Sequence, residues 1–152
     1  MNLVEAIKPS LVQFDFDVKS KEDTIKKVID LMKESDLLSD ADRYLKDVYK
    51  RESESTTGIG MGIAIPHAKS EGVKETCFSL IKLKDPIEWE SLDEKPVNYV
   101  IMLAVPSGAN DEYLRILSTL ATNLMDDDFR ESLITSETIE DVYETFKNTE
   151  VV

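Results

Sequence analysis

The stretch Val97-Asn98-Tyr99-Val100-Ile101-Met102-Leu103-Ala104-Val105 is apolar apart from one amide side chain and the Tyr99 hydroxyl, and Pro106 ends it. A run of this kind predicts a β-strand that is buried on both faces, as parallel strands are. Sheets that bury both faces carry helices on both sides. This stretch therefore favours an α/β fold.

The flanking sequence supplies further strands and helices. Residues 11–18 alternate apolar and polar side chains, which indicates a half-buried strand, and residues 76–83 read as another strand. Turns are expected at Asp85-Pro86 and at residues 92–96. Helical spacing predicts helices at about 21–35, 40–51, 110–124 and 127–133 and a last one from Ser136. Ser20, Asp40 and Asn110 are expected to cap the first three of these helices. The expected apolar face of the 110–124 helix consists of Leu114, Leu117, Leu120, Ala121 and Leu124.

Together these elements predict one α/β domain over residues 1–152. Its sheet is expected to be mixed and mostly parallel, with helices on both faces in a three-layer arrangement. The order of the strands is left open by the sequence.

Composition and charge narrow the class of function. The chain has 152 residues, 41% of them hydrophobic and 32% charged, which is typical of a folded globular protein. Its formal charge of -13 repels phosphate backbones and anionic lipid, so we expect neither nucleic-acid binding nor membrane insertion. One cysteine, Cys77, and no signal-peptide pattern indicate a cytoplasmic protein. A single histidine and a single cysteine do not form a Cys/His zinc site, and we expect no metal.

A glycine-rich window, Ser55-Thr56-Thr57-Gly58-Ile59-Gly60-Met61-Gly62-Ile63-Ala64-Ile65-Pro66-His67, holds three of the five glycines. Backbone amides at such glycines can approach an anion, with hydroxyl donors from Thr56 and Thr57 and a cation from Arg51. The spacing matches neither a P-loop nor a dinucleotide site. A tight hairpin is the alternative reading. Ile59 and Met61 are candidates for an apolar docking rim; Ile63, between them and His67, is more simply a core residue.

His67, the only histidine, ends the short apolar run 63–65. A side chain just beyond a strand of an α/β domain faces the crevice where ligands bind. A neutral imidazole is nucleophilic at cytoplasmic pH and can attack phosphorus. The alternative is a histidine that serves packing or lies solvated in a loop.

The stretch from Arg51-Glu52 to Pro66-His67 resembles the signature of the fructose/mannitol-type enzyme IIA of the phosphoenolpyruvate-dependent sugar phosphotransferase system, a type-2 EIIA domain. Further similarity lies in Ser20-Lys21-Glu22, in Trp89 with Asp93 and Pro96-Val97, and in Asn110-Asp111-Glu112 with Leu114. The resemblance implies a cytoplasmic phosphocarrier without a cofactor. It implies that His67 takes a phosphoryl group from HPr and passes it to a cysteine of enzyme IIB, which serves the membrane subunit enzyme IIC. Arg51 matches the arginine near the phosphoryl group, and Thr56, Thr57 and Gly58 are the expected phosphoryl-binding donors.

One position departs from the family pattern. Most members have a second histidine where this chain has Tyr113, and a tyrosine carries no positive charge at neutral pH. Tyr113 is either a reduced helper or a packed ring. Asp111 and Glu112 either orient His67 or complement a helix dipole. Two rival functions follow: a regulatory, nitrogen-type enzyme IIA whose phosphorylation state other proteins sense, and an interaction module with an inert histidine. The sugar cannot be read from the sequence.

Overall fold

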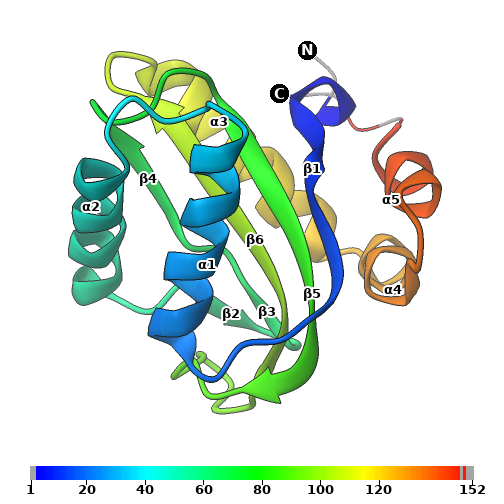
Figure 1. The fold of residues 1–152 in the computed structure, drawn as a ribbon. Coiled ribbons are helices and arrows are strands. Elements are labelled where there is room, and N and C mark those ends of the chain that lie inside the picture. Colours follow the sequence, from blue (N-terminus) through cyan, green and yellow to red (C-terminus); the bar gives the residue numbers. More distant parts are fainter. Residues whose placement is uncertain (1–2, 148, 150–152) are drawn as a thin grey trace.

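The structure is a computed structural model that describes residues 3–147 and residue 149 (Figure 1). The chain begins with the 3-10 helix η1 (Leu3–Ala6). The strands are β1 (Ile7–Phe16), β2 (Gly58–Gly60), β3 (Ile63–Ala64), β4 (His67–Ser70), β5 (Cys77–Ile87) and β6 (Val97–Pro106). The α-helices are α1 (Lys21–Glu34), α2 (Ala41–Glu54), α3 (Asn110–Leu124), α4 (Asp127–Thr135) and α5 (Ile139–Phe146).

β6, which contains the apolar stretch 97–105, lies at the centre of the sheet. The order is β1-β5-β6-β3-β2, and β4 also pairs with β6. β5 is antiparallel to β6, whereas β3 and β4 pair in parallel with successive parts of its other edge. β1 is parallel to β5, and β2 forms a hairpin with β3. Within the described residues, three strand pairs are thus parallel and two antiparallel, which confirms the mixed, mostly parallel sheet.

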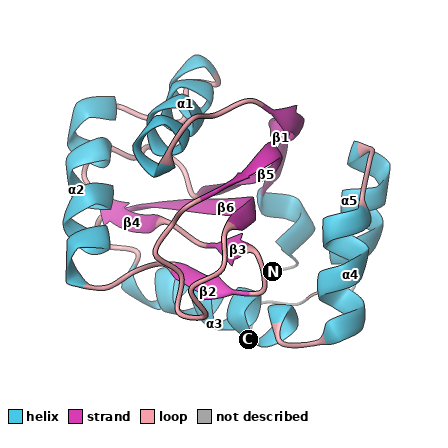
Figure 2. Cartoon of the chain, turned by 90° about the horizontal axis from the view of Figure 1, so that it is seen from below, coloured by secondary structure: helices cyan, strands magenta, loops and turns pink. Residues whose placement is uncertain are grey.

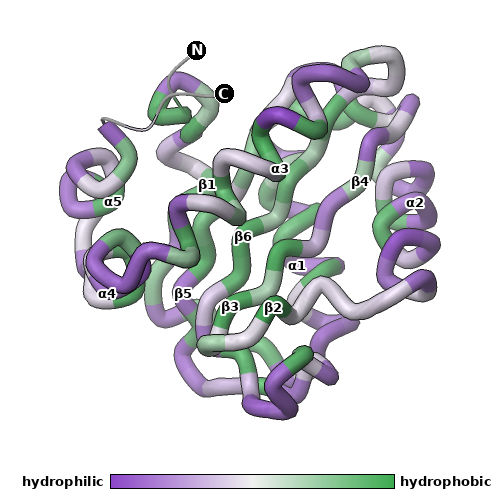
Figure 3. Tube along the Cα trace, turned by 180° about the vertical axis from the view of Figure 1, so that it is seen from behind, coloured by the Kyte–Doolittle hydropathy of each residue, from purple (hydrophilic) through white to green (hydrophobic). Residues whose placement is uncertain are grey.

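Helices cover both faces of this sheet, as expected (Figure 2). One core lies under α1 and α2 and includes Val28, Tyr44 and Met102. The other lies under α3, α4 and α5 and includes Leu103, Leu120 and Phe146. The hydrophobic residues concentrate on the strands between the two layers of helices (Figure 3). Alternate residues of β6 enter opposite cores, and this is why the strand is apolar along its whole length.

Two of the three predicted helix caps are confirmed. The Ser20 hydroxyl accepts a hydrogen bond from the Asp23 amide, and the Asp40 carboxylate accepts one from the Arg43 amide. The prediction for Asn110 is wrong, because this residue is the first residue of α3 and Ala109 occupies the cap position. The Asn110 side-chain oxygen instead accepts a hydrogen bond from the ammonium of Lys69.

The predicted apolar face of α3 is also partly wrong. Leu114 is 63% exposed and Ala121 is exposed, whereas Ile116 and Leu120 are fully buried. Apolar residues occur along two neighbouring stripes of this helix, and the periodicity alone does not say which stripe meets the sheet. Packing selects the stripe that starts at Tyr113.

The strand predictions differ from the structure at their ends. β1 starts at Ile7. Its adjacent residues Leu11 and Val12 are both buried, because their side chains enter opposite cores. The turn predicted at Asp85-Pro86 is wrong, because β5 continues through Ile87 with an irregular register against β6. The last helix begins at Ile139, after a capping box formed by Thr138.

Cys77 lies buried on β5, and burial raises the pKa of its thiol to about 12. Such a thiol is protonated and unreactive at neutral pH. Within residues 3–147, no helix is both long enough and apolar enough to cross a bilayer.

Candidate functional site

His67 is held in one orientation by the backbone that precedes it. It opens β4, where it pairs with Leu103 of β6, and its Nδ1 lies 2.6 Å from the carbonyl oxygen of Ile65. A carbonyl only accepts hydrogen bonds, so Nδ1 carries the proton and donates it. The lone pair of the neutral ring is then on Nε2. This nitrogen has no hydrogen-bond partner among the described residues and is free to react.

The surroundings of His67 keep its imidazole neutral. The residue is partly buried, and burial lowers its pKa below the usual value of 6.5. The hydrogen bond to Ile65 opposes this shift, Arg51 lowers the pKa further and Glu52 raises it. A lowered pKa leaves the nucleophilic form dominant at pH 7. The ring is therefore partly exposed and carries a free lone pair on Nε2 at neutral pH.

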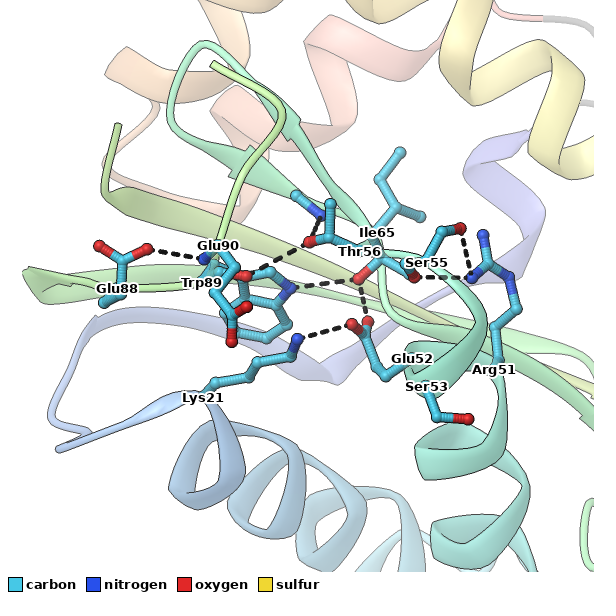
Figure 4. A network of polar contacts seen from close by, with 12 residues as sticks. Lys21, Arg51, Glu52, Ser53, Ser55, Thr56, Ile65, Glu88, Trp89 and Glu90 are labelled. Atoms are coloured by element: carbon cyan, nitrogen blue, oxygen red, sulfur yellow. Dashed lines mark hydrogen bonds and ion pairs between the residues drawn. The ribbon is translucent and has the colours of Figure 1, made fainter. Parts of the chain in front are cut away.

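Arg51 lies in the last turn of α2, on the same side of the molecule as His67. Its Nη1 donates to the backbone oxygen of Ser55 at 2.9 Å and to the Ser55 hydroxyl at 3.4 Å (Figure 4). This contact holds the guanidinium at the exposed end of the helix. Arg51 is close enough to His67 for its charge to lower the His67 pKa, and its role in phosphoryl transfer stays a prediction.

Tyr113 completes the surroundings of the histidine. Its ring centroid lies 5.8 Å from that of His67, at an interplanar angle of 51°. Burial raises the pKa of the Tyr113 hydroxyl, so this group stays protonated and can donate a hydrogen bond. Tyr113 and Arg51 line one open cavity of about 290 Å³, whose other lining residues are Asp47, Lys50, Glu54, Ala68 and Lys69. The position of the missing second histidine is thus beside His67.

Two further residues near this cavity were not predicted as functional from the sequence, Lys69 in its lining and Leu114 directly after Tyr113. Lys69 is exposed and lies two residues beyond His67 on β4, so that both side chains point to the same face of the strand. Leu114 is a large exposed apolar side chain directly after Tyr113. The two-residue spacing from His67 was the available signal for Lys69; no sequence signal distinguished Leu114 from a core residue.

The predicted donors Thr56, Thr57 and Gly58 lie between Arg51 and the hairpin, and each makes internal hydrogen bonds. The Thr57 hydroxyl donates to Glu52 and accepts from the Trp89 indole nitrogen at 3.2 Å. The Thr56 hydroxyl accepts from the Gly58 amide at 3.1 Å. These contacts shape the segment next to the site. Direct binding of a phosphoryl group by these three residues stays a prediction.

The glycines of the glycine-rich window form a tight hairpin between β2 and β3, which confirms the alternative prediction. Gly60, Met61 and Gly62 all have positive φ, and the Met61 amide donates to Asp93 at 2.9 Å. Because Ile63 and His67 pair with residues of β6 that are four apart, roughly 13 Å of strand separates the start of β3 from the start of β4. Met61 is 45% exposed and Ile59 is half-buried. Both therefore lie well away from His67, and docking at this rim stays a prediction.

Asp111 and Glu112, at the acidic start of α3, form no hydrogen bond with His67 among the described residues. Asp111 is exposed, and Glu112 lines a different cavity together with Lys8 and Glu75. Both lie in the first turn of α3, where a carboxylate complements the helix dipole. Among the described residues, no group of three or more His, Cys, Asp or Glu side chains is arranged to hold a metal ion.

Comparison with known proteins gives a consistent result. Residues 5–149 match the family model described as phosphoenolpyruvate-dependent sugar phosphotransferase system, EIIA 2. The chain is 34% identical over 135 residues to the PTS system fructose-specific EIIA component of Haloferax volcanii, covering 87% of this chain and 88% of that protein. It is 36% identical over 137 residues to the PTS system fructose-specific EIIABC component of Bacillus subtilis, covering 90% of this chain and 22% of that longer protein.

Solved structures share the fold. Nitrogen regulatory protein IIA-Ntr from Neisseria meningitidis superposes with a TM-score of 0.82 at 29% identity, over 94% of this chain and 97% of that one. The enzyme IIA of the Escherichia coli mannitol system, solved in complex with phosphorylated enzyme IIB, gives a TM-score of 0.77 at 16% identity, over 93% and 98% of the two chains. The family match spans nearly the whole chain, and its fold and motif agree with it. The chain belongs to the EIIA 2 family of the phosphoenolpyruvate-dependent sugar phosphotransferase system and is a phosphotransferase component of that system.

Proposed function

We propose that this chain is a phosphocarrier that accepts a phosphoryl group on Nε2 of His67. The observation that carries this proposal is the hydrogen bond from Nδ1 to the Ile65 carbonyl, which directs the lone pair to Nε2 on a partly exposed ring. The donor is phospho-HPr and the acceptor is a cysteine of enzyme IIB, working in the cytoplasm for uptake of a fructose- or mannitol-class sugar through enzyme IIC. Relatives of both sugar classes support this assignment.

Because the tautomer of His67 is fixed, the phosphoryl group can be transferred without moving the proton on Nδ1. Nε2 attacks phosphorus while the nitrogen–phosphorus bond of the donor histidine breaks, and the donor's imidazole, which carries a proton on its other ring nitrogen, leaves as a neutral group. The His67 ring then carries the phosphoryl group on Nε2 and the proton on Nδ1, still donated to Ile65. In the second step a thiolate of enzyme IIB attacks phosphorus, the Nε2–phosphorus bond breaks, and the ring returns to its starting tautomer. No proton has to leave Nδ1 in either direction.

The protein contributes alignment and charge rather than a cofactor. Phosphoryl transfer passes through a loose transition state that is stabilised mainly by positioning and by electrostatics. A cation about 4 Å from a phosphoryl oxygen contributes on the order of 4 kcal/mol at an effective dielectric constant of 20. The effect of Arg51 on the His67 pKa supports this role for Arg51, and Lys69 adds a second positive charge on the same face of β4 as His67. Few cations suit a carrier, because a phosphohistidine that is stabilised too strongly would not pass its phosphoryl group on.

A regulatory role is the second candidate. It is favoured by the likeness to the nitrogen regulatory protein and by Tyr113 in place of the second histidine. In that role the phosphorylation state would be sensed by partner proteins. The chemistry at His67 is the same in both roles, and the acceptor differs.

Reconstituted phosphorylation tests the proposal. With phosphoenolpyruvate, enzyme I and HPr, the wild-type chain should acquire one acid-labile phosphoryl group, and His67→Ala should acquire none. Rapid discharge by enzyme IIB of a fructose or mannitol system would support sugar uptake, and a label that enzyme IIB does not discharge would support regulation. An unlabelled wild-type chain would leave only the inert interaction module.

A further inference from the structure

A buried polar network lies next to the site and joins four parts of the chain (Figure 4). Lys21 Nζ lies 2.8 Å from Glu52 Oε2, and the two side chains are 17% and 6% exposed. The Thr57 hydroxyl donates to the other oxygen of Glu52 and accepts from the Trp89 indole. Lys21 Nζ also lies 5.4 Å from the centroid of the Trp89 ring. The network thus connects the start of α1, the end of α2, the segment before β2 and the loop between β5 and β6.

Glu52 is the residue directly after Arg51, and this places the network within reach of the chemistry. Neighbouring residues on a helix point about 100° apart. Contacts with Lys21 and Thr57 hold the Glu52 carboxylate toward the interior, and this fixes the orientation of the last turn of α2 about the helix axis. Arg51 then points outward to Ser55 and the cavity. Loss of this anchor would free the turn that carries the guanidinium.

Stability alone does not account for such a pair. Burying two charges costs desolvation energy that their attraction roughly offsets, and apolar replacements of buried ion pairs are often neutral or stabilising. An apolar pair would also fill the space beside Trp89. A fixed negative charge close to a nucleophilic imidazole is what the ion pair has and an apolar pair lacks.

Glu52 raises the pKa of His67, and it thus acts in the opposite direction to Arg51, which lowers this pKa. The other charged or titratable groups that line the adjoining cavity are Asp47, Lys50 and Glu54 of α2, Lys69 of β4 and Tyr113 of α3. These groups border open solvent, which screens them. The Glu52 carboxylate is nearly fully buried, and its field is offset chiefly by Lys21.

We propose that Lys21 and Glu52 form a positioning pair for His67: Glu52 fixes the direction of Arg51, and Lys21 sets how much of the Glu52 charge acts on a phosphoryl group at His67. The role in transfer rests on the proposed function of His67. Neither residue touches the phosphoryl group. A doubly negative phosphoryl group is repelled by Glu52 and attracted by Lys21. The pair therefore keeps phosphorylated His67 stable enough to form and unstable enough to pass its phosphoryl group on.

Opposite shifts from the two charge-removing variants test the pair. Glu52→Gln keeps the shape and loses a negative charge, so the His67 pKa should fall and the equilibrium phosphorylation by phospho-HPr should rise about threefold. Lys21→Met loses a positive charge, so the His67 pKa should rise and phosphorylation should fall by about the same factor. The double variant should return close to wild type in both. The His67 pKa is measured by NMR titration of the unphosphorylated chain, and the label is measured separately.

The anchor role has its own variant. Glu52→Ala loses the contacts to Lys21 and Thr57 as well as the charge, so it should slow transfer from phospho-HPr about tenfold or more, whereas Glu52→Gln should keep the wild-type rate or exceed it. The exposed pair of Lys8 and Glu75, which are 2.8 Å apart, serves as the matched control. Lys8→Met and Glu75→Gln should leave the His67 pKa and the label unchanged. Trp89 is the only tryptophan, so its fluorescence reports whether each variant is folded.

Two results would overturn the proposal. If the folded Glu52→Gln and Lys21→Met variants shift the His67 pKa in the same direction or not at all, Lys21 and Glu52 are structural only. Should one single variant fail to fold, the other single variant and the double variant still test the sign. A wild-type chain that acquires no phosphoryl group would instead refute the proposed function of His67. The pKa measurement would still decide whether Lys21 and Glu52 act on His67 through their charges.

Discussion

The segment from Arg51 to His67 folds back on itself, so that it has a chemical end, with Arg51 and His67, and a hairpin end, with the tip of the β2–β3 hairpin. At one end, Arg51, His67 and the neighbouring Tyr113 bring charge, a nucleophile and a donor together. At the other end, Gly60 and Gly62 turn the chain through positive φ angles at the tip of the β2–β3 hairpin. The sequence presents them as one motif because the hairpin returns the chain to His67. The chemistry thus gathers at one end, and the glycines serve the backbone at the other.

The largest expected effect is on stability, at Gly58, the first residue of β2, which lies between Arg51 and the hairpin tip. A Cβ added at Gly58 would lie 2.5 Å from the Ser91 hydroxyl oxygen and 2.9 Å from the Ser91 Cα. Since backbone has to move, Gly58→Ala should lower the unfolding free energy by about 3 kcal/mol. Gly108→Ala is the control, because it has positive φ but no atom within 4 Å, and it should cost about 1 kcal/mol. Equal losses in denaturant titrations would contradict this account.

Arg51→Gln should affect the chemistry and spare the fold. Loss of the cation beside His67 should reduce phosphorylation by phospho-HPr about 30-fold, which corresponds to about 2 kcal/mol. The unfolding free energy should change by less than about 0.5 kcal/mol, because the side chain is partly exposed. Arg43→Gln, two turns earlier on α2 and partnered by Asp47, is the matched control and should keep full activity. A similar loss in both variants would show that net charge, not position, matters.

The pH dependence should report the burial of His67. Burial lowers its pKa below 6.5, so as the pH falls the unfolded chain takes up a proton first. The stability contributed by the neutral ring is present above about pH 6.5 and is lost as the pH falls through the lower, folded value. His67→Gln should remove this part of the curve of unfolding free energy against pH. The phosphorylation rate should likewise stay flat to a lower pH than that of a free imidazole; a fall already at pH 7 would refute it.

Docking offers a direct comparison of the two ends. Leu114 is exposed beside Tyr113, and Met61 is exposed at the hairpin tip. Leu114→Ser should raise the KM for phospho-HPr about threefold at unchanged kcat, because it removes exposed apolar area directly after Tyr113. Met61→Ser tests the rim predicted from the sequence. A larger KM effect from Met61 than from Leu114 would move the docking surface to the hairpin end.

Tyr113→His should have the smallest effect, and in the favourable direction. A histidine at this place can donate a hydrogen bond and carries a partial positive charge near neutral pH, so transfer should become about two- to threefold faster. The gain should grow as the pH is lowered from 8 to 6.5, which distinguishes charge from shape. Tyr113→Phe is the control, and it should show no such pH dependence.

Residues whose roles depend on their immediate neighbours were predictable. Ser20 and Asp40 each cap the helix that follows by accepting a hydrogen bond from the amide three residues ahead, and Val97–Val105 is a central strand because of its own apolar side chains. Residues whose partners are distant in sequence were not. Asn110 accepts a hydrogen bond from Lys69, and the Thr57 hydroxyl forms hydrogen bonds with Glu52 and Trp89.

The sequence by itself determined the family, the apolar centre of the sheet and the identity of the lone imidazole, because these depend on residue type and local spacing. Only the tertiary structure decided the strand order, the exposed stripe of α3, the separation of the hairpin tip from His67 and the burial of Glu52 against Lys21. These features arise where segments far apart in the chain compete for the same partners, and the packing of the whole domain selects among them.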